Sequence, residues 1–185
     1  YRRAMALVPG HVEARANLAL TELLLGDWEH GFDGYELRFR TRKNRHCMPD
    51  NPAPKWAGEM LAGKRVLLFA EQGYGDAIQF IRFVPALLAK GASLTVQCQK
   101  RLQRLLATVA PGIAFVERAR PEDSFDFQIA LMSLPRILGV RPETTPANVP
   151  YLHSDVGRND LGRGRLGERG FKVGLAWQGN PAGSI

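Results

Sequence analysis

The chain has 185 residues, of which 45% are hydrophobic, 9% aromatic and 23% charged, and its formal net charge is +7. This globular composition excludes a disordered tail, a collagen and a coiled-coil rod, and the length allows one domain with a small appendage. No apolar run approaches the roughly 18 residues that a membrane-spanning helix needs, so we expect no membrane span.

Residues 1–45 show a helical pattern with the spacing of tetratricopeptide repeats. One unit ends in an aromatic, a small, a large apolar residue and a proline, which are Tyr1, Ala4, Leu7 and Pro9. The next unit has a large and a small residue at Leu18 and Ala19, a turn between its two helices at Gly26 and Asp27, and a small residue and an aromatic in the second helix at Gly31 and Tyr35. Arg38 stands where the repeat normally has alanine, so we expect this unit to be the last of the array. A generic helical hairpin is the alternative.

Residues 46–63 predict a connector, because they hold three prolines and two glycines, and we expect Trp56 to anchor it against a lobe. From residue 64 onward short apolar strands alternate with helices, which is typical of a parallel sheet with right-handed crossovers. The predicted strands are 65–69, 93–97, 113–116, 127–131 and 172–177. The predicted helices are 77–89, which Gly91 ends, 100–109 and 133–138. Residues 157–171 predict a linker rich in glycine and arginine.

Ligands of an open parallel sheet bind beyond the carboxyl ends of its strands, and the segment 71–76 is the first that meets this description. We expect its two glycines, Gly73 and Gly75, to let the backbone turn tightly and a ligand approach it closely, and the helix that follows offers free N–H groups. A carboxylate at Asp76 would repel a phosphate, so we expect a hydroxyl-bearing acceptor here and no dinucleotide. The candidate acceptor contacts are Gln72, Gly73, Tyr74, Gly75 and Gln79.

Asp76 has two interpretations of equal weight. A carboxylate at the base of a cleft can take the proton of a sugar or protein hydroxyl as that hydroxyl attacks. Alternatively, Asp76 is the N-cap of the predicted helix, and its spacing to Gln79 resembles a capping box.

Two further segments follow predicted strands. Ser133 precedes a leucine and a proline, so it is an ordinary helix cap and a weaker candidate for an acceptor contact. Gln178, Gly179 and Asn180 follow an apolar run, and this turn either presents main-chain amides to a diphosphate or is only a turn.

The positive charge is concentrated in residues 38–45 and 157–172. A nucleic-acid binder would spread basic residues over a face with aromatic platforms between them, so we do not expect a nucleic acid as partner. The two segments are either solvated or attract an anionic ligand such as a sugar diphosphate. The four histidines share no metal-site spacing, so we expect no metal. Cys47 and Cys98 are too few for a disulfide framework, which favours a reducing, cytoplasmic setting. Cys98 follows a predicted strand, so we expect its side chain to be buried.

A longer pattern joins these segments. Pro54-x-Trp56-x-Gly58 leads into the run 67–83, whose most specific part is Glu-Gln-Gly-Tyr-Gly-Asp at 71–76. Together with 131–135 and 173–181, this pattern resembles bacterial tetratricopeptide-repeat proteins that carry a glycosyltransferase-like domain. Such domains are similar to the heptosyltransferase family and, more remotely, to O-linked N-acetylglucosamine transferases.

The resemblance implies an α/β fold of GT-B type, in which two Rossmann-like lobes enclose a cleft. Residues 1–45 would be the end of the repeats, packed on a Rossmann-like acceptor lobe over 64–156. The donor lobe would begin with a strand in 172–185, so that Gln178, Gly179 and Asn180 face the donor phosphates. Because the chain stops early in that lobe, we expect this fragment to be inactive by itself.

In heptosyltransferases the aspartate of the Gly-Asp turn after the first strand resembles a general base, and that position is Asp76 here. The implied function is transfer of a hexosyl or heptosyl group from a nucleotide-sugar to a hydroxyl of a protein or glycan acceptor, which the repeats would present. No cofactor besides the nucleotide-sugar donor is implied. The alternative is a non-catalytic interaction module in which the repeats bind a protein partner.

Overall fold

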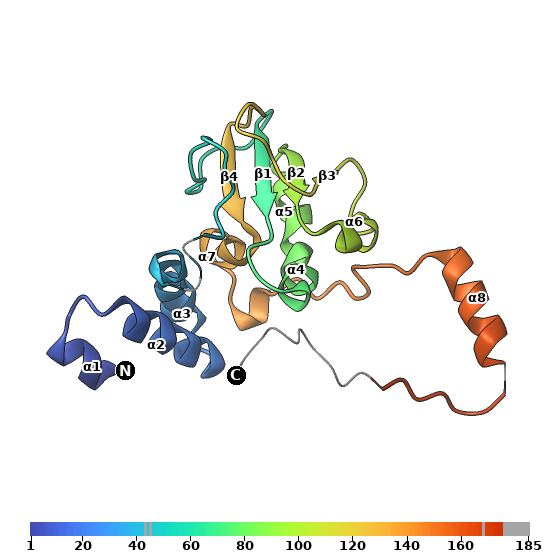
Figure 1. Cartoon of the computed structure of the whole chain (residues 1–185), viewed down its shortest axis with the longest axis horizontal. Coiled ribbons are helices and arrows are strands. Elements are labelled where there is room, and N and C mark those ends of the chain that lie inside the picture. Colours follow the sequence, from blue (N-terminus) through green and yellow to red (C-terminus); the bar gives the residue numbers. More distant parts are fainter. Residues whose placement is uncertain (43, 45, 168, 176–185) are drawn as a thin grey trace. The chain divides into compact units, whose positions relative to one another are not determined.

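The computed structural model describes residues 1–42, 44, 46–167 and 169–175. The chain divides into two compact units, the first spanning Tyr1–His153 and the second beginning at Ser154. The first unit is a mixed α/β structure that contains a four-stranded parallel sheet (Figure 1). Within the described residues, none of the helices combines the length and the apolar character needed to cross a lipid bilayer.

Helices fill the first forty residues, as the sequence predicts. They are α1 (Arg2–Leu7), α2 (Val12–Leu24), α3 (Trp28–Tyr35) and the 3₁₀ helix η1 (Glu36–Arg40). The predicted turn between α2 and α3 is confirmed, because Gly26 has a φ of 86° and the Asp27 carboxylate accepts the His30 N–H at 3.3 Å. We call residues 12–40 the hairpin. Its assignment as a tetratricopeptide unit stays a prediction.

The four parallel strands are β1 (Arg65–Phe69), β2 (Ser93–Gln97), β3 (Ala114–Val116) and β4 (Phe127–Ala130). They confirm the first four predicted strands, apart from one residue at an end of β3 and of β4. The strand order is β3-β2-β1-β4, so β2 and β3 are added on one side of β1 and β4 is added on the other. Apolar side chains on both faces bury β1, whose central residues 66–68 are 0% exposed. The strand order therefore reverses between β1 and β4.

The prediction of one continuous helix over 77–89 is wrong in two respects, because the helix starts earlier and is interrupted. The structure has α4 (Tyr74–Phe80), the 3₁₀ helix η2 (Ile81–Phe83) and α5 (Val84–Ala89). Pro85 has no N–H to donate to the Ile81 carbonyl, so the α-helical hydrogen-bond ladder is interrupted at η2. The predicted end is confirmed: Gly91 has a φ of 81°, and a Cβ there would lie 3.1 Å from the Ala62 Cα.

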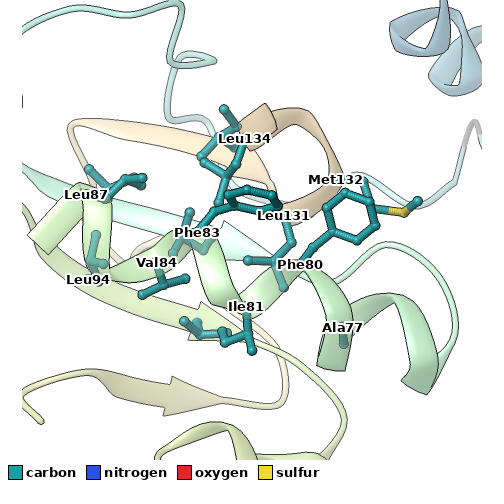
Figure 2. Close-up of a cluster of buried hydrophobic side chains, with 14 of the residues drawn as sticks. Ala77, Phe80, Ile81, Phe83, Val84, Leu87, Leu94, Leu131, Met132 and Leu134 are labelled. Carbon is teal, nitrogen blue, oxygen red and sulfur yellow. The ribbon is translucent and has the colours of Figure 1, made fainter. Parts of the chain in front are cut away.

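The remaining helices of the first unit are α6 (Lys100–Leu106), η3 (Leu131–Ser133), α7 (Leu134–Ile137) and η4 (Pro142–Thr144). Figure 2 shows how the apolar side chains of α4, η2 and α5 gather with those of η3 and α7. Ile81, Val84, Leu87 and Leu134 are 0% exposed. The core thus lies between the sheet and the segments that follow β1 and β4, which fixes those two segments relative to each other.

The connector 46–63 packs along β4, and the predicted anchoring by Trp56 is confirmed. Trp56 is 4% exposed, its main-chain N–H donates to the Gln128 carbonyl at 3.0 Å, and the Gln128 N–H donates to the Pro54 carbonyl at 2.8 Å. The Gln128 side-chain amide also donates to the carbonyls of Asn51 and Ala53. The connector therefore satisfies polar groups at the free edge of β4.

The second unit differs from the prediction. Residues 157–166 belong to the helix α8 (Val156–Leu166), whose first turn is capped by the Asp155 carboxylate, which accepts the Arg158 N–H at 3.0 Å. That 157–171 link two lobes stays a prediction. Residues 172–175 have no regular structure, whereas a strand was expected from 172 to 177. No strand pairs with this segment within the described residues, and a lone strand has no partner for its main-chain hydrogen bonds.

Candidate functional site

The candidate site lies where β1 and β4 end, at the reversal of strand order. We call residues 70–73 the β1–α4 loop, because they join the last residue of β1 to the first residue of α4. At the same edge, β4 continues directly into η3. A crevice at such a reversal is the usual ligand position of an open parallel sheet. The structure thus brings the two predicted acceptor segments, 71–76 and 132–135, to neighbouring strand ends.

Asp76 lies on the first turn of α4 and is not the N-cap of that helix. The N-cap is Gly73, and the Gly73 N–H donates to Asp76 Oδ2 at 3.0 Å. This is one half of a capping box, with the carboxylate at its third helical position. Asp76 is half-buried, and its Oδ1 accepts no hydrogen bond from the described part of the chain. One carboxylate oxygen thus caps the helix, while the other is free to bind a hydroxyl.

The two glycines of the segment are not required by the backbone. Gly73 has an extended conformation, with φ of −72° and ψ of 172°, that any residue can adopt. Gly75 has an ordinary helical conformation, and a Cβ there would meet no atom within 4 Å. The prediction that the glycines serve a tight turn is therefore wrong. A ligand still has room to approach the backbone at Gly75, which lies next to the exposed side chains of Tyr74 and Gln79.

Gln72 connects the β1–α4 loop to the hairpin. Its side-chain Nε2 donates to the Tyr35 hydroxyl at 2.7 Å, and its main-chain carbonyl accepts from Gln99 Nε2 at 3.3 Å. Burial raises the pKa of Tyr35 above its ordinary value, and the negative charges of Glu71 and Asp76 add to this rise. Tyr35 is therefore a neutral hydroxyl at the edge of the site, and Gln72 is engaged with it.

A buried arginine of the hairpin contacts both strand ends. The Arg38 side chain is 1% exposed and donates to Glu71 Oε1 from Nη2 at 2.7 Å and from Nε at 3.2 Å. Nη2 also donates to Ser133 Oγ at 2.8 Å, and Nη1 donates to Glu36 Oε1 at 2.8 Å. The guanidinium carbon lies 4.2 Å from the centre of the Phe39 ring. Arg38 thus ties η1 to the end of β1 and to η3.

Glu71 is the acidic partner of this arginine. Burial raises the pKa of the Glu71 carboxyl, and the Arg38 charge and hydrogen bonds oppose this rise. Main-chain N–H groups of Glu71 and Met132 also lower this pKa, but within the described residues the buried Oε2 atom makes no hydrogen bond of normal geometry. A buried carboxylate of this kind depends on a paired cation, here Arg38, because an uncompensated buried charge is strongly unfavourable.

Ser133 lies inside this network and not at an open surface. The residue is 3% exposed, and its hydroxyl accepts from Arg38 and donates to Glu36 Oε1 at 2.6 Å. Its hydroxyl is already bonded to Arg38 and Glu36, although Ser133 also lines the cavity described below. In this structure Ser133 therefore supports the site from behind, whereas Gly73, Tyr74, Gly75 and Gln79 are exposed.

A separate cavity of about 210 Å³ lies between η1, the connector, β4 and α7. Its walls include Phe39, Trp56, Phe69 and Gln128, and Lys55 stands at its rim with Nζ 5.0 Å from the centre of the Phe39 ring. Asp76 is not among its lining residues. The cavity and the β1–α4 loop are thus distinct features of the same sheet edge.

The predicted donor contacts Gln178, Gly179 and Asn180 lie outside the described residues. Within the described ranges, no three histidine, cysteine, aspartate or glutamate side chains are grouped in a way that could hold a metal ion. The acceptor half of the predicted site is therefore the part whose geometry is known.

Sequence reasoning missed the Arg38–Glu71 pair and the Tyr35–Gln72 hydrogen bond. Two signals pointed to the pair: an arginine at a repeat position that normally holds alanine, and a glutamate at the end of an apolar strand. Neither signal names its partner, because 33 residues separate the two in the chain.

Comparison with known proteins gives a distant similarity. The chain is 28% identical to the protein FlbA of Caulobacter vibrioides, in an alignment that covers 89% of this chain and 30% of FlbA. The chain therefore spans less than a third of the length of this relative. No family model matches the sequence, and no solved structure matches it. None of these findings assigns the chain to a family.

Proposed function

We propose that the chain is the acceptor-binding part of a glycosyltransferase of GT-B type, with tetratricopeptide-type helices before a Rossmann-like lobe. The reaction is transfer of a sugar from a nucleotide-sugar donor to a hydroxyl group of a protein or glycan. The observation that carries the proposal is the position of Asp76. It is half-buried on the first turn of the helix that follows the central strand, with one oxygen bound to Gly73 and the other free.

The chemistry follows from that free oxygen. An acceptor hydroxyl bound over α4 attacks the sugar carbon, and its proton moves to Asp76 Oδ1 as the new carbon–oxygen bond forms. The bond between the sugar and the nucleoside diphosphate breaks, and the diphosphate leaves with the electron pair. Its negative charge needs a donor lobe that supplies hydrogen-bond donors, which we place beyond the described residues.

The exposed residues beside Asp76 form the acceptor surface. Tyr74 is 47% exposed, and Gln79 is exposed beside it on α4. An aromatic ring and an amide suit a hydroxyl-rich ligand, because the ring covers an apolar face while the amide can donate and accept. The empty space over Gly75 lets such a ligand approach the helix backbone.

The proposal is tested by Asp76→Asn in the complete polypeptide that contains the donor lobe. The amide keeps an oxygen that accepts the Gly73 N–H, so we expect the melting temperature to stay nearly unchanged. It cannot take a proton from the acceptor, so we expect transfer from the nucleotide-sugar to be abolished in an assay with labelled donor.

Asp76→Ala is the matched control, because it removes both the base and the cap. We expect it to lower the free energy of unfolding by about 0.5–2 kcal/mol, the usual cost of losing such a cap. If Asp76→Asn retains transfer while Asp76→Ala loses stability, the carboxylate is only a helix cap and the catalytic proposal fails.

The second candidate is a non-catalytic module that binds a protein through its helices. It is favoured by the exposed leucines of the helical region, since Leu7, Leu24 and Leu25 are 80%, 87% and 81% exposed. A calorimetric titration of the complete polypeptide with nucleotide-sugars separates the candidates. Saturable binding supports the glycosyltransferase, and the absence of binding to any nucleotide-sugar supports the module.

A further inference from the structure

The β1–α4 loop is held by four hydrogen-bonded anchors, and two of them come from the hairpin. On the sheet side, the Ala70 N–H donates to the Gln97 carbonyl at 2.9 Å, and Gln99 donates to the Gln72 carbonyl. On the hairpin side, Arg38 binds the Glu71 carboxylate, and the Tyr35 hydroxyl accepts from the Gln72 amide. The loop is therefore clamped between β2 and the hairpin.

The two hairpin anchors act from one surface of the chain. Tyr35 is the last residue of α3, Arg38 lies in the η1 turn that follows, and residues three apart on a helix share a face. Both are buried, at 7% and 1% exposure, and the Arg38 guanidinium carbon lies 4.8 Å from the centre of the Tyr35 ring. Packing therefore helps to fix the positions of both side chains, in addition to their hydrogen bonds with the loop.

The loop held in this way is connected directly to Asp76. Gln72 is followed by Gly73, whose N–H holds Asp76 Oδ2 at 3.0 Å. A shift of Gln72 therefore moves the donor that orients the Asp76 carboxylate. The charge of Glu71 adds to the coupling, because within the described residues Arg38 is the cation paired with its buried carboxylate.

We propose that Tyr35 and Arg38 are positioning residues for Asp76: through Gln72 and Glu71 they hold the loop from which α4 begins, so the hairpin is a structural part of the site. The catalytic meaning of this position rests on the proposed function, but the positioning itself does not. The two can fail separately, because mobility of the loop is measurable without any transfer reaction.

The experiment measures backbone order parameters of residues 71–76 and the amide resonance of Gly73 by NMR in this chain. Tyr35→Phe keeps the buried ring and removes the hydroxyl, and Arg38→Lys keeps the charge but not the fork that reaches Glu71 and Ser133 together. In both variants we expect the order parameters to fall from about 0.85, the value of rigid backbone, towards about 0.6. The Gly73 amide proton should move upfield as its bond to the carboxylate weakens.

The control is Arg136→Met, which removes a different contact between hairpin and lobe. Arg136 binds Asp33 at 2.8 Å, both side chains are exposed, and neither is bonded to residues 70–73 in the described part of the chain. We expect the order parameters of residues 71–76 to stay unchanged in this variant. A fall in the control as large as in Tyr35→Phe would overturn the proposal, because the loop would then respond to any loosening of the hairpin.

If Arg38→Lys does not fold, Tyr35→Phe decides the matter alone. Unchanged order parameters and an unmoved Gly73 resonance in a folded Tyr35→Phe variant also overturn the proposal, even if its melting temperature falls. In the complete polypeptide, Tyr35→Phe should lower kcat about 10- to 100-fold through misplacement of the base and leave the KM for the donor unchanged. A changed donor KM with an unchanged kcat contradicts positioning.

Discussion

At the scale of single residues, the most constrained group of the site is the Arg38 guanidinium. It is almost fully buried, and it donates to two carboxylates, one hydroxyl and the Tyr35 carbonyl. Burying an ion pair gains little stability over an apolar pair of the same size, but removing one partner alone leaves an unpaired buried charge. Such a network is therefore better suited to fixing an arrangement of segments than to raising stability.

This asymmetry predicts the outcome of a double-mutant cycle. Arg38→Met should lower the free energy of unfolding by about 3–5 kcal/mol, because it leaves the Glu71 carboxylate buried without a cation. Adding Glu71→Met should recover most of that loss, since two apolar side chains of similar length then fill the space. Urea unfolding followed by circular dichroism measures both values.

The exposed pair of Arg136 and Asp33 is the control for that cycle. Both side chains are about half exposed or more, at 45% and 65%, so breaking the pair should change stability by less than ~1 kcal/mol. Additive effects of Arg38→Met and Glu71→Met, without recovery in the double variant, would show that the two residues are not coupled.

Residue roles were predictable where they depend on local chemistry. The sequence predicts a buried Cys98, and the residue is 3% exposed, with burial raising the pKa of its thiol to about 11. The sequence also places Asp76 at the start of a helix, but it takes the aspartate for the N-cap and misses Gly73. A glycine cap leaves no side-chain signal, so the helix start was placed three residues too late. Contacts such as Arg38–Glu71 depend on the tertiary fold.

At the scale of elements, α2 and α3 pack closely because α3 has glycine on the face towards α2. A Cβ at Gly31 would lie 2.7 Å from the Leu23 Cγ and 2.9 Å from the Leu23 main-chain nitrogen, and one at Gly34 would lie 2.9 Å from the Ala19 Cβ. A Cβ atom does not fit at position 31 or 34 at these distances, and at position 31 the main chain of Leu23 would have to move to make room. The predicted small residue at position 31 is thus explained by direct helix contact.

Gly31→Ala should therefore force the two helices apart. We expect the free energy of unfolding to fall by about 1–3 kcal/mol, the usual cost of overpacking, although alanine favours helix more than glycine does. A thermal melt of the whole chain measures the effect.

Gly10→Ala is the matched control, because a Cβ at Gly10 meets nothing within 4 Å. It should leave stability unchanged or raise it by about 0.4–1 kcal/mol through a less flexible unfolded state. Equal melting temperatures for Gly31→Ala and the unmodified chain would show that the helices have room to separate.

Elements were predictable where a run of apolar residues is bounded by turn residues, as in β1 and β2. The errors have identifiable causes. The break at η2 follows from Pro85, which lies inside an otherwise apolar helix and was not treated as a breaker. The helix α8 was missed because its glycines suggested a linker, whereas the Asp155 cap sets its start.

At the scale of the whole molecule, the hairpin and the sheet belong to one compact unit, Tyr1–His153. The sequence showed the change from helices to a connector near residue 45 and to alternating strands and helices from residue 64. The pairing of Arg38 with Glu71 across that point was not visible, because it joins residues on opposite sides of the connector. Composition can mark where the secondary structure changes, but a buried ion pair across the change makes the two sides depend on each other.

This dependence predicts that residues 46–153 are much less stable without the hairpin. The fragment retains the sheet but loses Arg38, so Glu71 is left without its cation and the apolar residues beneath the hairpin are exposed. We expect residues 1–153 to melt in one transition at the temperature of the whole chain, and residues 46–153 to melt at a clearly lower temperature or to lack a cooperative transition. Differential scanning calorimetry compares the three proteins.

Glu71→Gln in the shorter fragment provides the control, because it removes the unpaired charge and should restore part of the lost stability. Equal melting temperatures for 46–153 and 1–153 would show that the sheet does not need the hairpin.

The connector along β4 has a consequence for how this sheet can grow. Both main-chain groups of Gln128 on the outer side of the edge strand are already bonded to Pro54 and Trp56. Another polypeptide could pair with this edge strand only by displacing the connector, which is anchored by the buried Trp56. Within the described residues, the other border of the sheet is the three-residue strand Ala114–Val116, and a border that short is a poor template for aggregation.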